Sequence, residues 1–499
     1  MLMKVVVLSL AVLLSSLGVV TPVAAQQKAL ESITEADVRR RVGVIADDSM
    51  GGRATPSPGL ERTAQYIAAE FARFGLQPAG DSGSFIQRYP LTRSNIDAKK
   101  SSLTLTVGEL TIVARATSDL VYLYGARNDT PRKGRLLLLA SMTQEAARSA
   151  PVEGRLVMLA GPARAGSTVN QLIPLLAERR PVAIIIVSDV DSMVLARQVA
   201  AQQRVRVSAG TAPAGPLVVS VHQRALGSVL EAAGVDLARA RMDEAPLVRD
   251  IPVAATLRVS DVPGTSAGAP NVAAILEGSD PELRREYIVF SAHMDHVGTS
   301  STAGPDSIFN GADDDASGTA GVLELAEAYT RRGGRPKRSL IFLTVSGEER
   351  GLWGSAYFAA NPPVPMGQIV ANINMDMIGR NWPDTIVVIG KEHSDLGTTL
   401  DRVNAAHPEL RMTAIDDLWP GQNFYTRSDH YNFARRGVPI LFFFNGVHAD
   451  YHKASDSPDK IDAEKEARLL RLIYLLGLEI GNAPERPRWN DASYRKIVK

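Results

Sequence analysis

The sequence predicts an α/β fold in which a mostly parallel sheet is covered by helices on both faces and carries a smaller inserted domain, β-rich or α+β. After Asn271, continuous apolar runs alternate with helical patterns, which is typical of parallel strands buried between helices. The length of 499 residues exceeds that of one ordinary domain. In the middle of the chain, short apolar runs alternate with Ala-rich helical segments, and this change of sequence pattern predicts an insertion.

The N-terminus predicts a signal peptide over residues 1–25. Lys4 precedes an apolar run from Val5 to Val20, and Val23-Ala24-Ala25 forms a small-residue cleavage pattern. A membrane anchor is the alternative, but the run is short for a span and contains several serines. We therefore expect cleavage after Ala25 and a secreted or periplasmic protein that is not held in the membrane.

The mature chain is expected to form a discontinuous catalytic domain with an insertion and a tail. Ala64, Ile67, Ala68 and Phe71 share one helix face near the start, and Gly75 is a plausible end of that helix. The middle of the chain has short apolar runs and few candidate catalytic side chains. The predicted ranges are 26–112 and 251–485 for the catalytic domain, 113–250 for the insertion and 486–499 for the tail.

Composition limits the chemistry and the partners. The net charge is +1, and we see no stretch dense in Lys and Arg, which argues against nucleic acid as a partner. The chain has no cysteine. Any metal site must therefore use His, Asp and Glu.

Polar clusters follow the expected strands, where ligands of parallel sheets collect. His293 follows the strand at 287–290 and is a candidate metal ligand, with Asp295 as the carboxylate that would orient its ring. Asp314 lies at the centre of Asp313-Asp314-Asp315 before a predicted helix, where it can bridge two ions. An acidic helix start is the alternative interpretation.

The later clusters supply the remaining groups. Glu348 and Glu349 follow the strand at 340–345, and we expect Glu348 to act as general base and Glu349 as a ligand. Asp376 ends the run at 369–375, where a carboxylate must be paired or bound to metal. The last candidates are His452 as a ligand, Asp456 as its supporting carboxylate, and Tyr425 as a hydrogen-bond donor to an oxyanion.

Together, these imidazoles and carboxylates suit a pair of Zn²⁺ ions bridged by one carboxylate. A pair of zinc ions about 3.5–4 Å apart supplies both a nucleophilic water and a Lewis acid. The sequence therefore predicts hydrolytic chemistry with two zinc ions as the cofactor.

The motifs resemble those of the zinc exopeptidases that include secreted bacterial leucyl aminopeptidases, aminopeptidase Y and glutamate carboxypeptidase. The matching segments, in the order and with spacing similar to the family's, are Ala292-His-Met-Asp295, Gly311-Ala-Asp-Asp-Asp-Ala-Ser-Gly318, Gly347-Glu-Glu-Arg-Gly351, Met375-Asp-Met377, Ser428-Asp-His430 and Tyr451-His452. The start with Gly51-Gly52-Arg53 is also similar. The middle segment resembles, more loosely, a protease-associated domain.

The resemblance implies that His293 and Asp376 hold one zinc ion and that Glu349 and His452 hold the other, with Asp314 between them. It also implies that Glu348 is the general acid and base and that a peptide is the substrate, cleaved at its N-terminus. A carboxypeptidase, with Arg380 or Arg427 reading a terminal carboxylate, and a glutaminyl cyclase are alternatives on the same fold. A catalytically silent, receptor-like binding protein is the non-enzymatic alternative. The substrate side chain and the oligomeric state are not predicted.

Overall fold

The structure is a computed structural model that describes residues 22–498, except 126, 141–142, 162–165, 210–214, 243–247, 265–267, 301–303 and 305. The chain divides into two compact units, one formed by residues 1–89 with 268–499 and the other by 90–267. The second unit is wider than the predicted insertion, 113–250. Residues 91–94, which precede that range, pair with residues 206–209 inside it, and residues 261–264, which follow it, pair with residues 93–96; sequence periodicity does not reveal these pairings.

The first unit is built on a nine-stranded sheet in the order β1-β14-β18-β15-β19-β22-β20-β21, with β2 also paired to β14. Its centre, β18-β15-β19-β22, is parallel, and the strands flanking that centre pair with it in antiparallel fashion. The strands are β1 Gln77–Pro78, β2 Ile86–Tyr89, β14 Ala269–Leu276, β15 Tyr287–His293, β18 Ser339–Val345, β19 Ile369–Met375, β20 Thr385–Ile389, β21 Thr413–Ile415 and β22 Ile440–Phe443; β16 Gly298–Thr299 and β17 Ile308–Phe309 form a separate ribbon.

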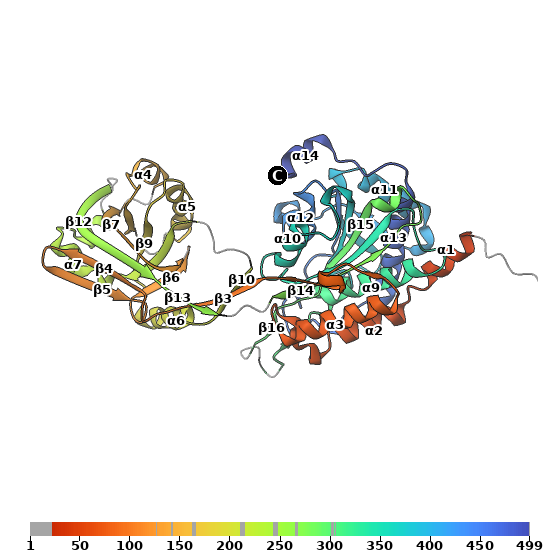
Figure 1. Ribbon diagram of the computed structural model, residues 1–499, viewed down its shortest axis with the longest axis horizontal. Helices are drawn as coiled ribbons and strands as arrows, with labels where there is room; N and C mark the ends of the chain where they lie inside the picture. Colours follow the sequence, from red (N-terminus) through yellow and green to blue (C-terminus); the bar gives the residue numbers. More distant parts are fainter. Residues whose placement is uncertain are drawn as a thin grey trace, which may run out of the picture. The chain divides into compact units, whose positions relative to one another are not determined.

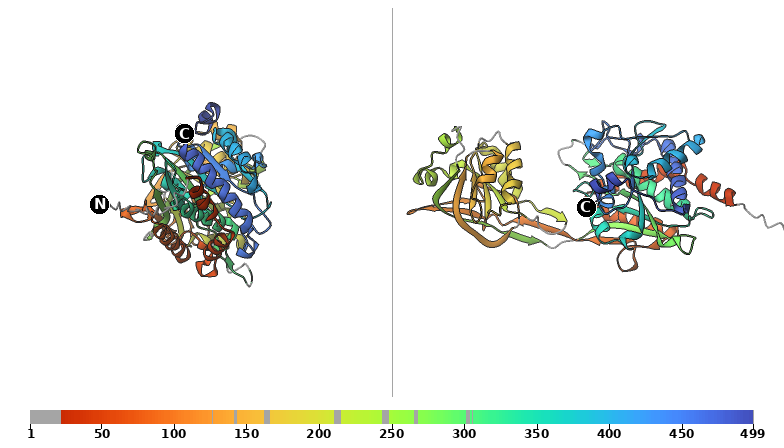
Figure 2. Two further views of the ribbon diagram at one scale, coloured as in Figure 1. Left: turned by 90° about the vertical axis from the view of Figure 1, so that its right-hand side faces the viewer. Right: turned by 90° about the horizontal axis from the view of Figure 1, so that it is seen from above.

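Helices cover both faces of this sheet (Figures 1 and 2). Contacts place α3 and α9 against one face, with α2 and α13 packed on α9, and α10 and α12 against the other face. The helices are α1 Pro22–Glu31, α2 Glu35–Ile45, α3 Pro58–Arg73, α9 Gly318–Thr330, α10 Trp353–Ala360, α11 Leu396–Ala406, α12 His430–Ala434, α13 Ala463–Asn482 and α14 Asp491–Ile497. This arrangement confirms the predicted fold class.

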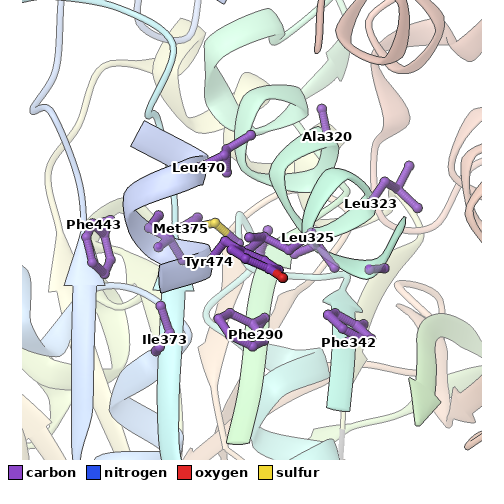
Figure 3. Close-up of a cluster of buried hydrophobic side chains, with 14 of the residues drawn as sticks. Phe290, Ala320, Leu323, Leu325, Phe342, Ile373, Met375, Phe443, Leu470 and Tyr474 are labelled. Carbon is purple, nitrogen blue, oxygen red and sulfur yellow. The ribbon is translucent and has the colours of Figure 1, made fainter. Parts of the chain in front are cut away.

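Side-chain alternation along the buried strands explains the layers. Phe290 and Phe342 join the core with α9 and α13, whereas Val289 and Ile341 join the core on the other face. Successive residues of a strand point to opposite faces, so a strand that is apolar throughout must be covered twice. Figure 3 shows Phe290, Phe342 and Ile373 beneath Leu325 and Tyr474 of the covering helices.

Local signals account for the helix ends. The Ser57 side chain accepts a hydrogen bond from the Leu60 amide at the start of α3, and Pro58 occupies the first turn, where its missing N–H costs nothing. The predicted face of Ala64, Ile67 and Phe71 is buried, and the helix ends near Gly75, as expected.

The second unit has an eight-stranded sheet in the order β5-β4-β12-β7-β8-β9-β11-β6 and a three-stranded sheet, β10-β3-β13. Its strands are β3 Leu91–Ile96, β4 Ser102–Val107, β5 Leu110–Arg115, β6 Leu120–Tyr124, β7 Asn128–Leu139, β8 Leu156–Leu159, β9 Ala183–Ser188, β10 Arg206–Ala209, β11 Leu217–His222, β12 Val248–Val259 and β13 Asp261–Gly264. Its helices are α4 Gln144–Ser149, α5 Gly166–Ala177, α6 Ser192–Gln202, α7 Gly227–Ala232 and α8 Leu237–Met242.

The structure describes parts of both predicted terminal segments. Most of the predicted signal peptide, residues 1–21, lies outside the described residues, and the predicted cleavage position after Ala25 falls within α1. The predicted tail, 486–499, contains α14, and Trp489 before this helix donates a hydrogen bond to the Gly437 carbonyl. Within the described part of the chain, no helix combines the length and apolarity that a membrane span requires.

Candidate metal centre

The predicted site residues converge at the carboxyl ends of the parallel strands. His293 is the last residue of β15, and Asp376 directly follows β19. Glu349 lies in the loop after β18, and His452 lies in the loop that follows β22. Because these strands run in the same direction, their following loops meet at one edge of the sheet.

The acidic loop separates its three carboxylates by role. Asp313 accepts hydrogen bonds from the Gly379 amide and His448, and Asp315 accepts from the amides of His293, Gly318 and Met377. Both therefore hold neighbouring loops together. Asp314 alone of the three faces the other predicted ligands, and the peptide bond that joins it to Asp315 is cis.

The two oxygens of Asp314 face two separate groups of side chains. Its Oδ1 lies 3.3 Å from Nε2 of His293, which in turn lies 3.6 Å from Oδ1 of Asp376. Its Oδ2 lies 3.1 Å from Nε2 of His452, which lies 3.2 Å from Oε2 of Glu349. Within each group, all candidate ligand atoms are within 4.8 Å of one another.

Zinc fits these groups. Atoms held tetrahedrally at the usual distances from one zinc ion lie about 3.3–3.6 Å apart, close to the separations seen here. Among the described residues, His452 Nε2 and Glu349 Oε1 are buried without a hydrogen-bond partner, and both ring nitrogens of His296 are in the same condition. Buried polar atoms without partners are costly, and a cation would satisfy His452 Nε2, Glu349 Oε1 and the His296 nitrogen that faces them, Nδ1.

The carboxylates also raise the pKa values of the neighbouring imidazoles, which is consistent with a cation site. Burial alone would lower the pKa of His452, but the Asp314 and Glu349 carboxylates raise it to about 10. Burial likewise opposes protonation of His293, yet Asp376 and Asp314 raise its pKa well above the usual value. The carboxylates thus stabilise positive charge at the positions that metal ions would occupy.

Arg53 is the permanent cation beneath this cluster. It is fully buried, and its guanidinium donates to the carbonyls of Met294 at 2.9 Å, Ile45 at 3.0 Å, Asn310 at 2.5 Å and Gly311 at 2.9 Å. The preceding Gly52 is required because a Cβ there would lie 2.2 Å from the Gly298 carbonyl oxygen. The Gly51-Gly52-Arg53 segment therefore fixes the loops that carry His293 and Asp314.

The supporting carboxylates act differently from the sequence-based prediction. Nδ1 of His293 is 3.2 Å from the backbone carbonyl of Asp295 but 3.8 Å from its carboxylate. That carboxylate accepts hydrogen bonds from the Thr55 hydroxyl and the Glu348 amide. Asp456 was expected beside His452, but its carboxylate instead accepts the amides of Asp313 and Asp314 and so fixes the acidic loop.

A cavity with an empty volume of about 400 Å³ opens onto these residues. One part is polar, with Glu348 beside Asp314, and another part is apolar. Burial raises the pKa of Glu348 well above its usual value. The His293 imidazole opposes this rise, whereas the Asp429 and Asp376 carboxylates add to it. The lining residues are His293, Asp314, Glu348, Asp376, Met377, Phe424, Arg427, Ser428, Phe442, Phe444, Val447 and Tyr451.

The structure places the Tyr425 ring in a packed environment beside two histidines. Tyr425 is not among the described residues that line the cavity; its ring packs edge-on against His393, with centroids 4.6 Å apart, and against His430. The neighbouring Phe424 lines the cavity instead, because consecutive residues of this short turn point in different directions. Tyr451 is the tyrosine at the site, with its ring stacked on His452 at 3.9 Å.

The converging residues lie in a segment of the chain that resembles a known family. Residues 271–476 match the model of Peptidase family M28. This segment, which is less than half of the chain, is similar to that family. It contains His293, Asp314, Glu348, Glu349, Asp376 and His452, so the converging residues and the family match coincide in the chain.

Two curated proteins are similar to part of the chain. The chain is 33% identical over 200 residues to Leupeptin-inactivating enzyme 1 of Streptomyces exfoliatus, covering 39% of this chain and 40% of that protein. It is 35% identical over 263 residues to a probable zinc metalloprotease of Pyricularia oryzae, covering 44% of this chain and 51% of that protein. The chain thus spans about half the length of these curated relatives.

A solved aminopeptidase shares the fold over most of the chain. The aminopeptidase from Aneurinibacillus sp. strain AM-1 superposes with a TM-score of 0.52, covering 92% of this chain and 97% of that one. Sequence identity is 18%, so this likeness describes architecture alone.

Proposed function

We propose that the protein is a di-zinc aminopeptidase, which removes N-terminal residues from peptides. The observation that carries the proposal is the position of Asp314, whose two oxygens face two separate groups of ligands. His293 and Asp376 would hold one ion, and Glu349 and His452 would hold the other. The family match and the name of the zinc metalloprotease relative support the choice of metal and reaction.

The chemistry divides between the metals and the chain. A zinc pair held by these residues would supply Lewis-acid chemistry, which lowers the pKa of a water and polarises a peptide carbonyl. Glu348 accepts the proton of that water and later delivers it to the nitrogen of the leaving amine. Its raised pKa suits both halves of this transfer, because the group can hold a proton between the two steps.

Tyr451 replaces Tyr425 in the proposed mechanism. Burial raises the pKa of its hydroxyl, and the Asp314 and Glu349 carboxylates raise it further, so the hydroxyl stays protonated. A protonated hydroxyl at the cavity wall donates a hydrogen bond to the carbonyl oxygen as negative charge develops there. Tyr451→Phe should therefore lower kcat while leaving metal content unchanged.

The cavity also suggests the substrate class. The carboxylates of Glu348 and Asp376 favour a free, positively charged N-terminal amine over a blocked one. The apolar part, lined by Phe424, Phe442 and Phe444, favours a large apolar side chain on the first residue. We therefore propose leucyl and aromatic N-termini as preferred substrates.

The proposed function is tested with paired peptides that differ only in an acetyl group on the N-terminus. Zinc analysis should give two ions per chain, and the free peptide should be cleaved after its first residue. A chelator should abolish cleavage, and added zinc should restore it. Equal cleavage of the free and acetylated peptides, or activity indifferent to strong chelators, would contradict the proposal.

Carboxypeptidase action is the second candidate, because Arg427 lines the cavity and can read a terminal carboxylate. Arg380, the other candidate, is paired with Asp450 at 3.0 Å and is not among the described lining residues. Release of C-terminal residues from acetylated peptides, lost in Arg427→Gln, would favour this candidate.

Export and the role of the inserted unit are also proposals. The N-terminal Lys4, apolar run and small-residue motif support export to the periplasm or medium with cleavage after Ala25. Mass spectrometry of the mature chain from the cell fractions tests this.

We propose that residues 90–267 form a protease-associated domain. Superposition of this unit alone on such domains tests the proposal, and a different strand order would reject it.

A further inference from the structure

His296 is a buried histidine at the metal centre whose role the five proposed ligands leave unexplained. It follows His293 by three residues and is 1% exposed. Its Nδ1 points at the same space as His452, because it lies 2.9 Å from Oε1 of Glu349 and 3.6 Å from Oδ2 of Asp314. His296 thus completes a group of four with these three residues.

From this geometry we propose that His296 is a further zinc ligand, so that one ion has four protein ligands and the other has three. The proposal rests on the di-zinc function above. The group of His296, Asp314, Glu349 and His452 offers two imidazoles and two carboxylates. Two imidazoles and two carboxylates supply the usual four ligands of zinc, and a shared water would then make this ion five-coordinate.

The orientation of the ring separates ligation from a simple hydrogen bond. Although Nδ1 is 2.9 Å from the Glu349 oxygen, neither ring nitrogen of His296 has a hydrogen-bond partner among the described residues. The neighbouring separations of 3.1 and 3.2 Å, made by His452, are those of atoms around a common centre. The His296 and His452 rings meet at 76°, with centroids 5.4 Å apart.

The surrounding backbone holds the ring in this position. A Cβ on Gly311 would lie 2.5 Å from Cγ of His296 and 2.2 Å from the Asp314 carbonyl oxygen. Gly311 also has φ of +57°, which glycine adopts at little cost. The loop before the acidic cluster therefore leaves room for an imidazole beside Asp314.

The consequence is an unequal pair of positions. The group of His293, Asp314 and Asp376 supplies three protein ligands, as catalytic zinc sites do, whereas the other group supplies four, as many as a structural zinc site. Zinc should therefore leave the wild-type protein in two phases when a chelator is added, first from the three-ligand position and then from the four-ligand position.

The test is His296→Gln, with His407→Gln as the matched control at a partly exposed histidine paired to Glu409. The amide of glutamine can still donate a hydrogen bond to Glu349, but it is a poor zinc ligand. X-ray absorption should find three imidazoles per two zinc ions in the wild type and the control, and two in zinc-saturated His296→Gln.

Chelator competition gives the second measurement. Loss of a hydrogen-bonding partner of a ligand weakens metal binding roughly 10–100-fold. Loss of His296 as a ligand should therefore weaken zinc binding by more than about 100-fold, and only at the four-ligand position, from which zinc leaves slowly. The zinc ion at the three-ligand position should still bind, and its binding would show that the variant folds. Retention of three imidazoles and near-native slow release would overturn the proposal for His296. Absence of zinc from the wild type would instead contradict the proposed function.

Discussion

Replacing Arg53 by methionine removes the fully buried cation that ties the N-terminal segment to the metal-centre loops. Its four carbonyl acceptors, at 2.5–3.0 Å, would be left without their donor, and the nearby Asp295, Asp314 and Asp315 would lose a compensating charge. Removing one member of a buried charged network costs about 3–5 kcal/mol. The four hydrogen bonds do not add independently, so we expect Arg53→Met to lower the free energy of unfolding by this amount.

The chain offers a clean assay for this loss. All four tryptophans, Trp353, Trp382, Trp419 and Trp489, belong to the first unit, so fluorescence during urea unfolding reports on that unit. The measurement is made with a chelator present, so that zinc binding does not contribute. Arg39→Met is the control, because Arg39 forms an exposed pair with Glu35 on α2 that is worth about 0.3–0.5 kcal/mol. A loss below about 1 kcal/mol in Arg53→Met, at an unchanged denaturant slope, would refute the reasoning.

Three further predictions concern the site and its surroundings. Glu348→Gln should lower kcat roughly 10²–10⁴-fold while zinc content stays at two ions, since Glu348 belongs to neither ligand group; near-normal turnover would remove it from its role. Asp314→Asn should bind less zinc at both positions because each uses one oxygen of this carboxylate; two tightly bound ions would contradict the bridge. Burial lowers the pKa of His430 to about 3, so the unfolded chain gains a proton that the native protein refuses as pH falls below about 6.5, and stability is lost. From pH 7 to pH 5 this amounts to about 2 kcal/mol, and chelator-treated His430→Gln should lose that much less than the wild type over the same interval; equal losses would exclude His430 as the source.

Most of the first unit could be predicted because its strands are continuously apolar. The predicted runs at 287–290, 340–345 and 369–375 correspond to β15, β18 and β19, and the groups at their carboxyl ends converge. Parallel strands of one sheet bring their following loops to a common edge, so the order of the clusters along the chain carried spatial information.

The remaining details depend on contacts that periodicity does not encode. His296 reaches the centre because Gly311 leaves room for its ring, a contact between residues far from each other in the strand pattern. The choice between Tyr425 and Tyr451 depends on the direction of one side chain in a short turn. The limits of the inserted unit depend on the pairing of β12 with β4 and β7, which joins distant segments.

The most direct test of the central claim is anomalous diffraction at the zinc edge from crystals of the zinc-loaded protein. We predict two peaks about 3.5–4 Å apart, one beside His293 and Asp376 and one beside Glu349 and His452, each next to a different oxygen of Asp314. A single peak, or two peaks of which one lies away from Asp314, would contradict the shared carboxylate on which the account depends.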